Sequence, residues 1–167
     1  MSKISTRIQP CLWFDGQAEE AAKFYVSVFP GSKLGAFSRY AEAGKDIHGK
    51  QPGSVMTVAF ELDGQPFLAL NGGPYFKFSE AVSLMVMCDT QEEIDHYWNA
   101  LSQGGDPAAQ QCGWLKDRYG LSWQITPAIF AEMITSTDRP AMERYMAALM
   151  TMKKLDIAQL QAAFEGR

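Results

Sequence analysis

The chain has 167 residues, of which 47% are hydrophobic and 20% are charged, and its formal net charge is −4 at pH 7. This composition is typical of a globular protein with one large domain or two small ones, and it excludes a largely disordered chain. An acidic chain without a basic stripe is a poor partner for nucleic acid, and no apolar run approaches the ~20 residues that span a bilayer, so we expect neither nucleic acid nor a membrane as a partner.

The first half of the chain is predicted to form one helix and four strands. The helix begins near Ala18, has apolar residues at the i, i+3, i+4 spacing of one buried face, and ends at the Pro-Gly of residues 30–31. Residues 63–64 are Asp-Gly, a strong two-residue hairpin signal between apolar runs. The polar segment 41–54 is predicted to be a mobile loop. The four strands are predicted at residues 7–14, 33–40, 55–62 and 65–71.

The second half repeats part of this pattern. The stretch FDGQAEEAAKFYVSVFPG begins at Phe14, and CDTQEEIDHYWNALSQGG begins at Cys88. Each stretch ends a strand, opens a helix with paired glutamates, places two aromatic residues side by side and stops at glycine. The second helix has Thr90 as its N-cap and Glu93 three residues later, which matches a capping box. The sequence therefore predicts a duplicated β-α-β-β-β unit.

The other elements of the second half follow from similar signals. Strands are predicted at 82–88, 112–117 and 121–127. The counterpart of strand 33–40 would fall near 106–111, where the sequence DPAAQQ is a poor strand signal. Beyond the repeat, Pro140 begins one helix and Asp156 a shorter one, both with apolar stripes. We expect this tail to cover a sheet edge or a partner subunit.

Side-chain parity divides each predicted strand into two faces. In 65–71, Leu68 and Leu70 are assigned to the face under the helix, opposite Phe67, Ala69 and Asn71. The second faces have some apolar bulk and almost no charge, so they are predicted to line a semi-enclosed cavity for a small ligand. A dimer interface or a hydrated groove without a ligand is the alternative. The polar residues on these faces are Gln9, Asn71, Ser83, Ser122, Gln124 and Thr126.

Four stretches carry a family resemblance: IQPCLWFDGQAEEAAKFY, LDGQPFLALNGGPYFKFSEAVSLMV, QEEIDHYWNALSQGG and CGWLKDRYGLSWQITP. The chain resembles the vicinal oxygen chelate superfamily, and within it the PhnB-like branch often named 3-demethylubiquinone-9 3-methyltransferase. The resemblance implies an α+β fold of two βαβββ modules, residues 1–73 and 74–127, whose eight strands form a cup-like pair of half-barrels. Residues 128–167 are then a C-terminal helical extension. Homodimers are usual in the superfamily.

The superfamily's usual chemistry uses four side chains, from the first and last strands of each module, to hold a divalent ion. These positions fall on Gln9, Asn71 (with Ala69 as the alternative), Ser83 and Gln124. None is His, Glu or Asp, and amide and hydroxyl oxygens bind Zn²⁺, Ni²⁺ or Fe²⁺ poorly. We therefore expect no metal and no cofactor at this site.

Several other residues are candidates for the site or lie near it in the sequence. Trp13 is a candidate for stacking on a planar ligand, with packing at the module seam as the alternative. His48 in the polar loop is expected to be solvated or part of a lid, and His96 to lie on the surface. Asp117 is expected to cap its turn. The candidate ligand-binding residues are Gln9, Trp13, Asn71, Ser83 and Gln124.

The predicted function is small-molecule binding on this scaffold, without the usual metal centre and with catalysis undecided. The alternatives are a metal-dependent lyase or dioxygenase of the same fold and the methyltransferase activity in the branch name. That activity normally needs a parallel sheet with a Gly-rich first turn, which the sequence does not show. The cysteines Cys11, Cys88 and Cys112 have no metal-like spacing, and the first 14 residues lack signal-peptide features. We therefore expect reduced thiols and a cytoplasmic location, and the family resemblance implies a homodimer.

Overall fold

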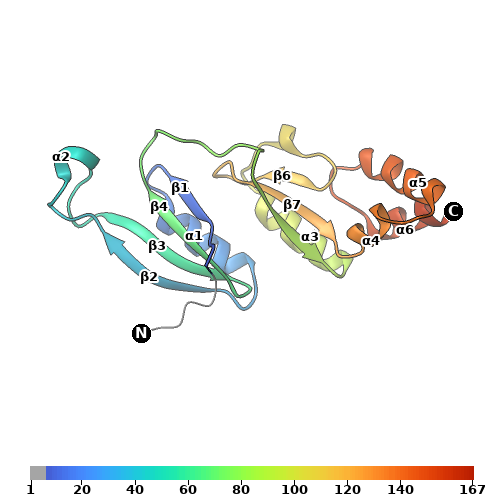
Figure 1. Ribbon diagram of the computed structural model, residues 1–167, viewed down its shortest axis with the longest axis horizontal. Coiled ribbons are helices and arrows are strands. Elements are labelled where there is room, and N and C mark those ends of the chain that lie inside the picture. Colours follow the sequence, from blue (N-terminus) through green and yellow to red (C-terminus); the bar gives the residue numbers. More distant parts are fainter. Residues whose placement is uncertain (1–6) are drawn as a thin grey trace. The chain divides into compact units, whose positions relative to one another are not determined.

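The structure is a computed structural model that describes residues 7–167, and the chain divides into two compact units, Met1–Lys77 and Phe78–Arg167 (Figure 1). Each unit has one open sheet with a single long helix packed on one of its faces. The second unit also contains the C-terminal helices. No helix in the described range is long and apolar enough to cross a membrane.

The first unit has the predicted β-α-β-β-β order. Its sheet has the strand order β1-β4-β3-β2, in which β1 and β4 are parallel and the other neighbours are antiparallel. The first strand is shorter than expected, and Ile8 before it is exposed. A one-turn helix, α2, interrupts the predicted polar loop. The elements are β1 (Cys11–Phe14), α1 (Ala18–Val28), β2 (Lys33–Arg39), α2 (Lys45–His48), β3 (Val55–Leu62) and β4 (Gln65–Asn71).

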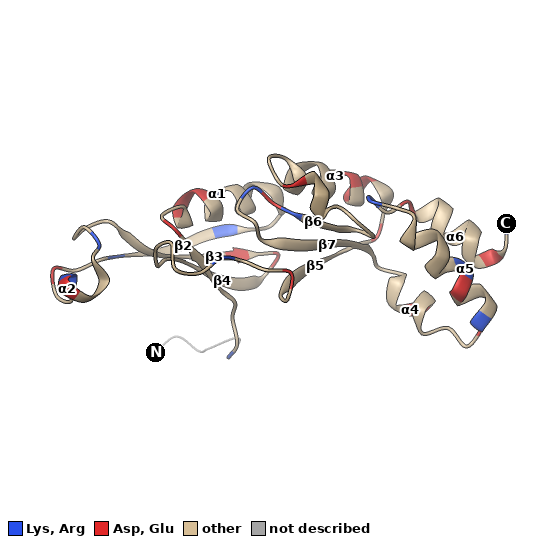
Figure 2. Ribbon diagram, turned by 90° about the horizontal axis from the view of Figure 1, so that it is seen from above, with Lys and Arg blue, Asp and Glu red and all other residues tan. Residues whose placement is uncertain are grey.

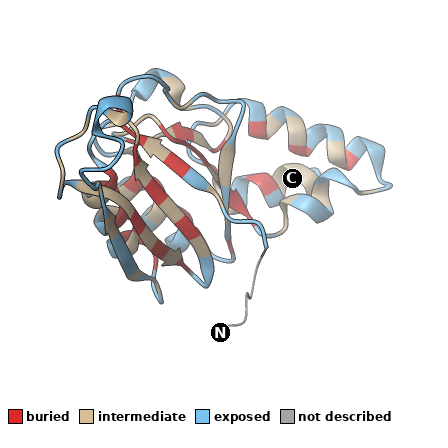
Figure 3. Ribbon diagram, turned by 60° about the vertical axis from the view of Figure 1, so that its left-hand side comes forward, coloured by how far each residue is buried: buried red, intermediate tan, exposed pale blue. Residues whose placement is uncertain are grey.

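Helix α1 covers one face of this sheet and forms the core of the unit with it. Tyr25 of α1 stacks on Phe60 of β3 at 6.2 Å between ring centroids, and Phe60 stacks on Phe67 of β4 at 5.2 Å. Buried and half-buried residues alternate along β3 and β4 (Figure 3), as expected for strands with one covered face. The predicted buried stripe of the helix is confirmed: Ala18, Ala21, Ala22, Tyr25 and Val28 are all buried.

The face assignment of β4 was wrong. Phe67, Ala69 and Asn71 lie under α1 and are buried, whereas Leu68 and Leu70 lie on the opposite face and are half-buried. Both faces of this strand are largely apolar, so parity separates them but does not say which one the helix covers. The register decides it, because Ala69 pairs with Leu12, which is itself buried.

The second unit has a smaller sheet, with the strand order β5-β7-β6. Strands β5 and β7 are parallel, and β6 and β7 are antiparallel. Figure 2 shows helix α3 lying over one face of this sheet. The elements are β5 (Ser83–Cys88), α3 (Gln91–Ser102), the 3₁₀ turn η1 (Pro107–Ala109), β6 (Trp114–Lys116) and β7 (Ser122–Pro127).

The eighth strand of the expected cup does not form, because residues 107–109 make the turn η1 instead. Asp106 caps this turn by accepting a hydrogen bond at Oδ1 from the Ala108 backbone N–H at 2.9 Å. Pro107 has no N–H to give to a sheet ladder. Only an isolated bridge between Gln111 and Trp114 remains. Over the described residues the sheets therefore have four and three strands.

The capping box predicted for α3 is confirmed. The Thr90 hydroxyl accepts a hydrogen bond from the Glu93 N–H at 3.2 Å, and the Glu93 carboxylate accepts one from the Thr90 N–H at 3.4 Å. The helix buries Ile94, Trp98 and Leu101. Two N–H groups at the helix start are thereby satisfied, which stabilises the first turn of the helix.

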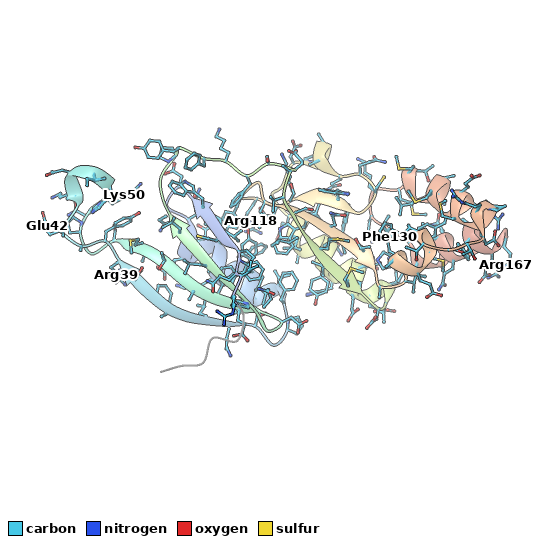
Figure 4. All side chains as sticks on the ribbon, in the orientation of Figure 1. Arg39, Glu42, Lys50, Arg118, Phe130 and Arg167 are labelled. Atoms are coloured by element: carbon cyan, nitrogen blue, oxygen red, sulfur yellow. The ribbon has the colours of Figure 1, made fainter. Side chains whose placement is uncertain are left out.

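The C-terminal extension has its own small core. The helices are α4 (Phe130–Ile134), α5 (Arg139–Met150) and α6 (Ile157–Glu165), and Figure 4 labels Phe130 and Arg167 near the two ends of this segment. The extension is fastened to the turn before β6, where the N–H groups of Cys112 and Gly113 donate to the carbonyls of Met152 and Lys153, each at 2.8 Å. The core residues are Tyr145, Leu149, Leu155 and Leu160.

Candidate functional site

The two units repeat one strand pairing, and this identifies equivalent positions in them. Phe14 at the end of β1 pairs with Asn71, and Cys88 at the end of β5 pairs with Pro127. Counting back five residues from Phe14 and from Cys88 makes Gln9 the equivalent of Ser83 in the repeat. Counting back three residues from Asn71 and from Pro127 makes Leu68 the counterpart of Gln124. The second family position therefore falls on an apolar side chain and not on Asn71 or Ala69.

Asn71 serves the fold of the first unit and does not face the predicted cavity. Its side-chain Oδ1 accepts a hydrogen bond from the Ala18 N–H at 2.8 Å, in the first turn of α1, and its Nδ2 donates to the Val55 carbonyl at 3.1 Å. The residue is 8% exposed. The prediction that Asn71 lies on a ligand-facing surface is therefore wrong, because it follows from the incorrect face assignment of β4.

Trp13 lies on the face of β1 away from α1. Its indole ring contacts other residues of the first unit. The indole Nε1 donates to the Gly73 carbonyl at 2.8 Å, and the ring meets Phe76 edge-on at 4.9 Å. A Cβ atom built at Gly72 would lie 2.1 Å from the indole ring. The ring therefore packs directly on Gly72, which supports the packing role more than ligand stacking.

Gln9 is exposed and precedes β1. It belongs to the first unit, whereas Ser83 and Gln124 belong to the second. Of the five candidate residues, the structure thus brings together one pair within a unit. That pair is Ser83 and Gln124.

Ser83 and Gln124 form a direct hydrogen bond on the face of the second sheet that α3 does not cover. The Gln124 Nε2 donates to the Ser83 hydroxyl oxygen at 2.8 Å. The two residues lie on the parallel neighbours β5 and β7, offset by two positions. The amide oxygen of Gln124 and the proton of the Ser83 hydroxyl remain available to a ligand, because neither group is used in this bond.

Two further residues extend this polar group. Ser122 lies between Ser83 on β5 and Lys116 on β6, paired with both. Its side chain is 1% exposed, and its hydroxyl has no hydrogen-bond partner among residues 7–167. Ser122 was already among the polar residues of the second strand face, but Lys116 was missed. The cross-strand register of the 112–127 hairpin is the signal that would have found it.

An ion pair completes the group. The Lys116 ammonium lies 2.5 Å from the Glu80 carboxylate, with the two side chains 25% and 63% exposed. The hydrogen bond from Lys116 lowers the pKa of Glu80 below its usual value. The face therefore carries one ammonium group beside neutral hydroxyl and amide groups. Such a set can orient a small polar or anionic molecule.

Asp117 holds the hairpin that presents these residues, as the sequence predicts for its turn. Its Oδ1 accepts hydrogen bonds from the N–H groups of Tyr119 and Leu121 at 2.8 and 3.1 Å. Its Oδ2 accepts one from the Trp123 Nε1 at 2.9 Å. The carboxylate is buried and used on both oxygens, so it positions β6 and β7.

His48 is half-buried, so the expectation of a solvated side chain was wrong. Its ring packs against Tyr40 at 4.7 Å between centroids, and its Nδ1 accepts a hydrogen bond from the Lys50 N–H at 3.0 Å. The Tyr40 hydroxyl donates to the Asn71 carbonyl at 2.6 Å. These contacts hold the 41–54 segment against the end of β4. Lys50, which belongs to this segment, is labelled in Figure 4.

The residues at the family's metal positions do not fit a divalent transition metal. The corrected set, Gln9, Leu68, Ser83 and Gln124, offers two amides, one hydroxyl and one side chain with no donor atom. Such ions prefer imidazole, thiolate or carboxylate ligands. Within residues 7–167, no group of three or more His, Cys, Asp or Glu side chains is placed to hold a metal. We therefore assign no metal-dependent step to this site.

Comparison with known proteins agrees with the fold. A family model described as 3-demethylubiquinone-9 3-methyltransferase matches residues 6–126. A solved structure described as a putative 3-demethylubiquinone-9 3-methyltransferase, PhnB protein, from Bacillus cereus is 39% identical, with a TM-score of 0.62 over 74% of this chain and 100% of that chain. Protein PA1353 from Pseudomonas aeruginosa is 22% identical, with a TM-score of 0.56 over 74% of this chain and 98% of that chain. No protein with curated annotation matches the chain.

The match covers both repeated units and stops before α4, so the C-terminal helices lie outside it. Since the family model spans most of the sequence and the Bacillus cereus chain is covered in full, the relationship is specific. This chain belongs to the 3-demethylubiquinone-9 3-methyltransferase family, in its PhnB-like branch.

Proposed function

We propose that the chain binds a small molecule on the α3-free face of its second unit, through Ser83, Ser122 and Gln124, without a resident metal ion. The observation that supports this most is the hydroxyl of Ser122, which is buried and unpaired beside the Ser83–Gln124 hydrogen bond. A buried hydroxyl without a partner costs about 1–3 kcal/mol. A ligand that pairs with it recovers this free energy.

The alternatives carried by the family receive less support from the residues. A metal-dependent lyase or dioxygenase needs ligands that the four family positions do not supply. A methyl-donor site of the common kind needs a Gly-rich turn between a parallel strand and a helix. Here β1 leads into α1 through Asp15, Gly16 and Gln17, which contain one glycine.

The chain is also proposed to form a homodimer and to reside in a reducing compartment. The homodimer is proposed from the superfamily resemblance. The test is the mass of the purified chain by light scattering at micromolar concentration, where a monomer would contradict it. A reducing compartment such as the cytoplasm is proposed because all three cysteines are free.

The ligand site is tested by screening small polar fragments against the ¹⁵N-labelled full chain by NMR. We expect fragments to shift the resonances of β5 and β7, and Gln124→Leu to remove those shifts while changing the free energy of unfolding by less than about 1 kcal/mol. Gln161→Leu on the exposed face of α6 is the matched control and should leave the shifts intact. Fragments that bind elsewhere, or equally well to Gln124→Leu, would contradict the proposal.

A further inference from the structure

Lys116 is a cation held on a rigid part of the second unit. Its backbone pairs with Ser122 across the hairpin, and the Asp117 carboxylate fixes the turn that follows. Gly105 packs against the Lys116 carbonyl so closely that a Cβ atom there would lie 1.9 Å from the carbonyl oxygen. The pairing with Ser122, the turn held by Asp117 and the packing of Gly105 therefore fix the position of the Lys116 backbone.

The carboxylate that pairs with Lys116 lies outside any helix or strand, and besides Lys116 it has a hydrogen bond with its own backbone. Glu80 lies in a short turn closed by a 3.4 Å hydrogen bond from the Val82 N–H to the Ser79 carbonyl. No helix or strand forms between β4 and β5. The Glu80 side chain is 63% exposed. The ion pair is exposed on its Glu80 side, where solvent weakens it, so another anion can compete with Glu80 for Lys116.

We propose that Lys116 is the anion-recognition group of the ligand site and that Glu80 occupies its ammonium until a ligand carboxylate takes its place. This inference rests on the proposed function and adds the chemical class of the ligand. Lys116, Ser122 and Ser83 form one row across the three strands. Neighbouring strands are about 4.8 Å apart, so the row spans about 10 Å between its outer backbones.

The charge of the site selects a carboxylate. A single ammonium balances one negative charge, which a carboxylate carries, whereas a phosphate monoester carries nearly two and needs more donors. The resident partner, Glu80, is itself a carboxylate, so the geometry already suits that group. The hydroxyls of Ser83 and Ser122 and the amide of Gln124 would pair with an adjacent hydroxyl or carbonyl oxygen. The ligand class is therefore a small hydroxy or oxo carboxylate.

The test uses two matched pairs of compounds on the ¹⁵N-labelled full chain. Mandelate is compared with 1-phenyl-1,2-ethanediol, and lactate with 1,2-propanediol, so that only the carboxylate differs within each pair. We expect both carboxylates to shift the amides of Lys116, Ser122 and Gln124 and to bind more tightly than their diols. Equal affinities within both pairs would overturn the inference.

Variants then test whether the Glu80 carboxylate and the ligand carboxylate compete for Lys116. Glu80→Gln removes the internal carboxylate at nearly constant size, so mandelate should bind about two- to fivefold more tightly. Lys116→Met should abolish the preference for mandelate over its diol. Lys154→Met is the control, because Lys154 pairs with Asp95 elsewhere in the same unit, and it should keep the preference. Thermal unfolding of each variant verifies that it is folded, and Lys116→Gln replaces Lys116→Met if that variant is not.

Different results would contradict the carboxylate assignment and the ligand site itself. If diols and carboxylates shift the same face equally, and Glu80→Gln changes nothing, the ligand site stands but the carboxylate assignment is wrong. If neither kind of compound shifts β5 or β7 in the parent chain or in Glu80→Gln, both are wrong. Unchanged or weaker binding of mandelate to Glu80→Gln would by itself overturn the competition between the two carboxylates.

Discussion

Asn71 illustrates how a polar residue in a strand can serve the fold instead of a ligand. It satisfies one N–H in the first turn of α1 and one carbonyl at the start of β3. Helix starts have N–H groups with no partner inside the helix, and a side-chain oxygen commonly supplies one. In α1 the residue at the N-cap, Gln17, makes no such bond, so an amide from a distant strand takes over this role.

Replacing Asn71 should destabilise the first unit. Asn71→Ala leaves a buried N–H and a carbonyl unpaired, and we expect the free energy of unfolding to fall by about 1–3 kcal/mol. Asn71→Asp keeps the acceptor for the Ala18 N–H and loses the donor to Val55. Gln9→Ala, at an exposed position, should be neutral in urea unfolding. An Asn71→Ala variant as stable as the parent chain would contradict this role.

Trp13 and Gly72 should be coupled in stability. Gly72→Ala places a methyl group where the indole ring lies, so it should destabilise the chain by about 1–3 kcal/mol. Trp13→Leu removes the ring, so Gly72→Ala should cost much less in that background. A double-mutant cycle by chemical unfolding measures the difference. Additive effects would show that the ring does not pack on Gly72 in solution.

At the scale of elements, local sequence signals predict where helices begin and end, but they do not predict which face of a strand is buried. The capping box of α3 and the Pro-Gly end of α1 depend on neighbouring residues in the chain, so the sequence contains them in full. The face of β4 that α1 covers depends on register with β1, a contact between distant residues. No strand forms near 106–111 because Pro107 begins a 3₁₀ turn, although the repeat predicts a strand there.

The C-terminal extension should depend on Gln91 of α3. The Gln91 side chain donates to the Leu155 carbonyl at 3.1 Å and accepts from the Ile157 N–H at 2.9 Å, which joins α3 to the start of α6. We expect Gln91→Ala to lower stability by about 1–2 kcal/mol and to speed hydrogen exchange at Ile157. Asn99→Ala, exposed on the same helix, should do neither. Unchanged exchange at Ile157 would contradict the docking role.

Tyr145 of α5 makes the second unit sensitive to alkaline pH. Burial raises the pKa of its hydroxyl from 10.0 to about 12, and that hydroxyl has no hydrogen-bond partner in the part of the chain that the structure describes. Between these pH values the unfolded chain loses this proton more readily than the folded one, so the free energy of unfolding falls as pH rises. Burial likewise raises the pKa of the Cys88 thiol from 9.0 to about 12.

The measurement is urea unfolding of the parent chain and Tyr145→Phe between pH 7 and 11. Tyr145→Phe should be as stable or more stable at pH 7, because it removes an unpaired buried hydroxyl. Above about pH 9 its stability should fall less steeply, with a difference on the order of 1–2 kcal/mol by pH 11. Parallel curves would contradict a buried, neutral hydroxyl.

At the scale of the whole molecule, the duplication was the most informative sequence feature. It predicted a helix packed on a sheet in each half of the chain, and the shared strand pairing then corrected one of the four family positions from Asn71 to Leu68. Ser83 and Gln124 were predicted for the site and lie in hydrogen-bond contact. Lys116, Glu80 and the buried state of Ser122 depend on cross-strand register and on an irregular segment, which residue types alone do not determine.

The central claim is that hydroxyl and amide groups beside one ammonium group, and no metal ion, make the ligand site of the second unit. It is tested most directly by elemental analysis of the full chain purified without chelators and then exposed to Zn²⁺, Ni²⁺ and Fe²⁺, alongside Gln124→Leu. We expect well under one equivalent of any of these metals in both proteins after desalting. One full equivalent in the parent chain that is lost in Gln124→Leu would contradict the account.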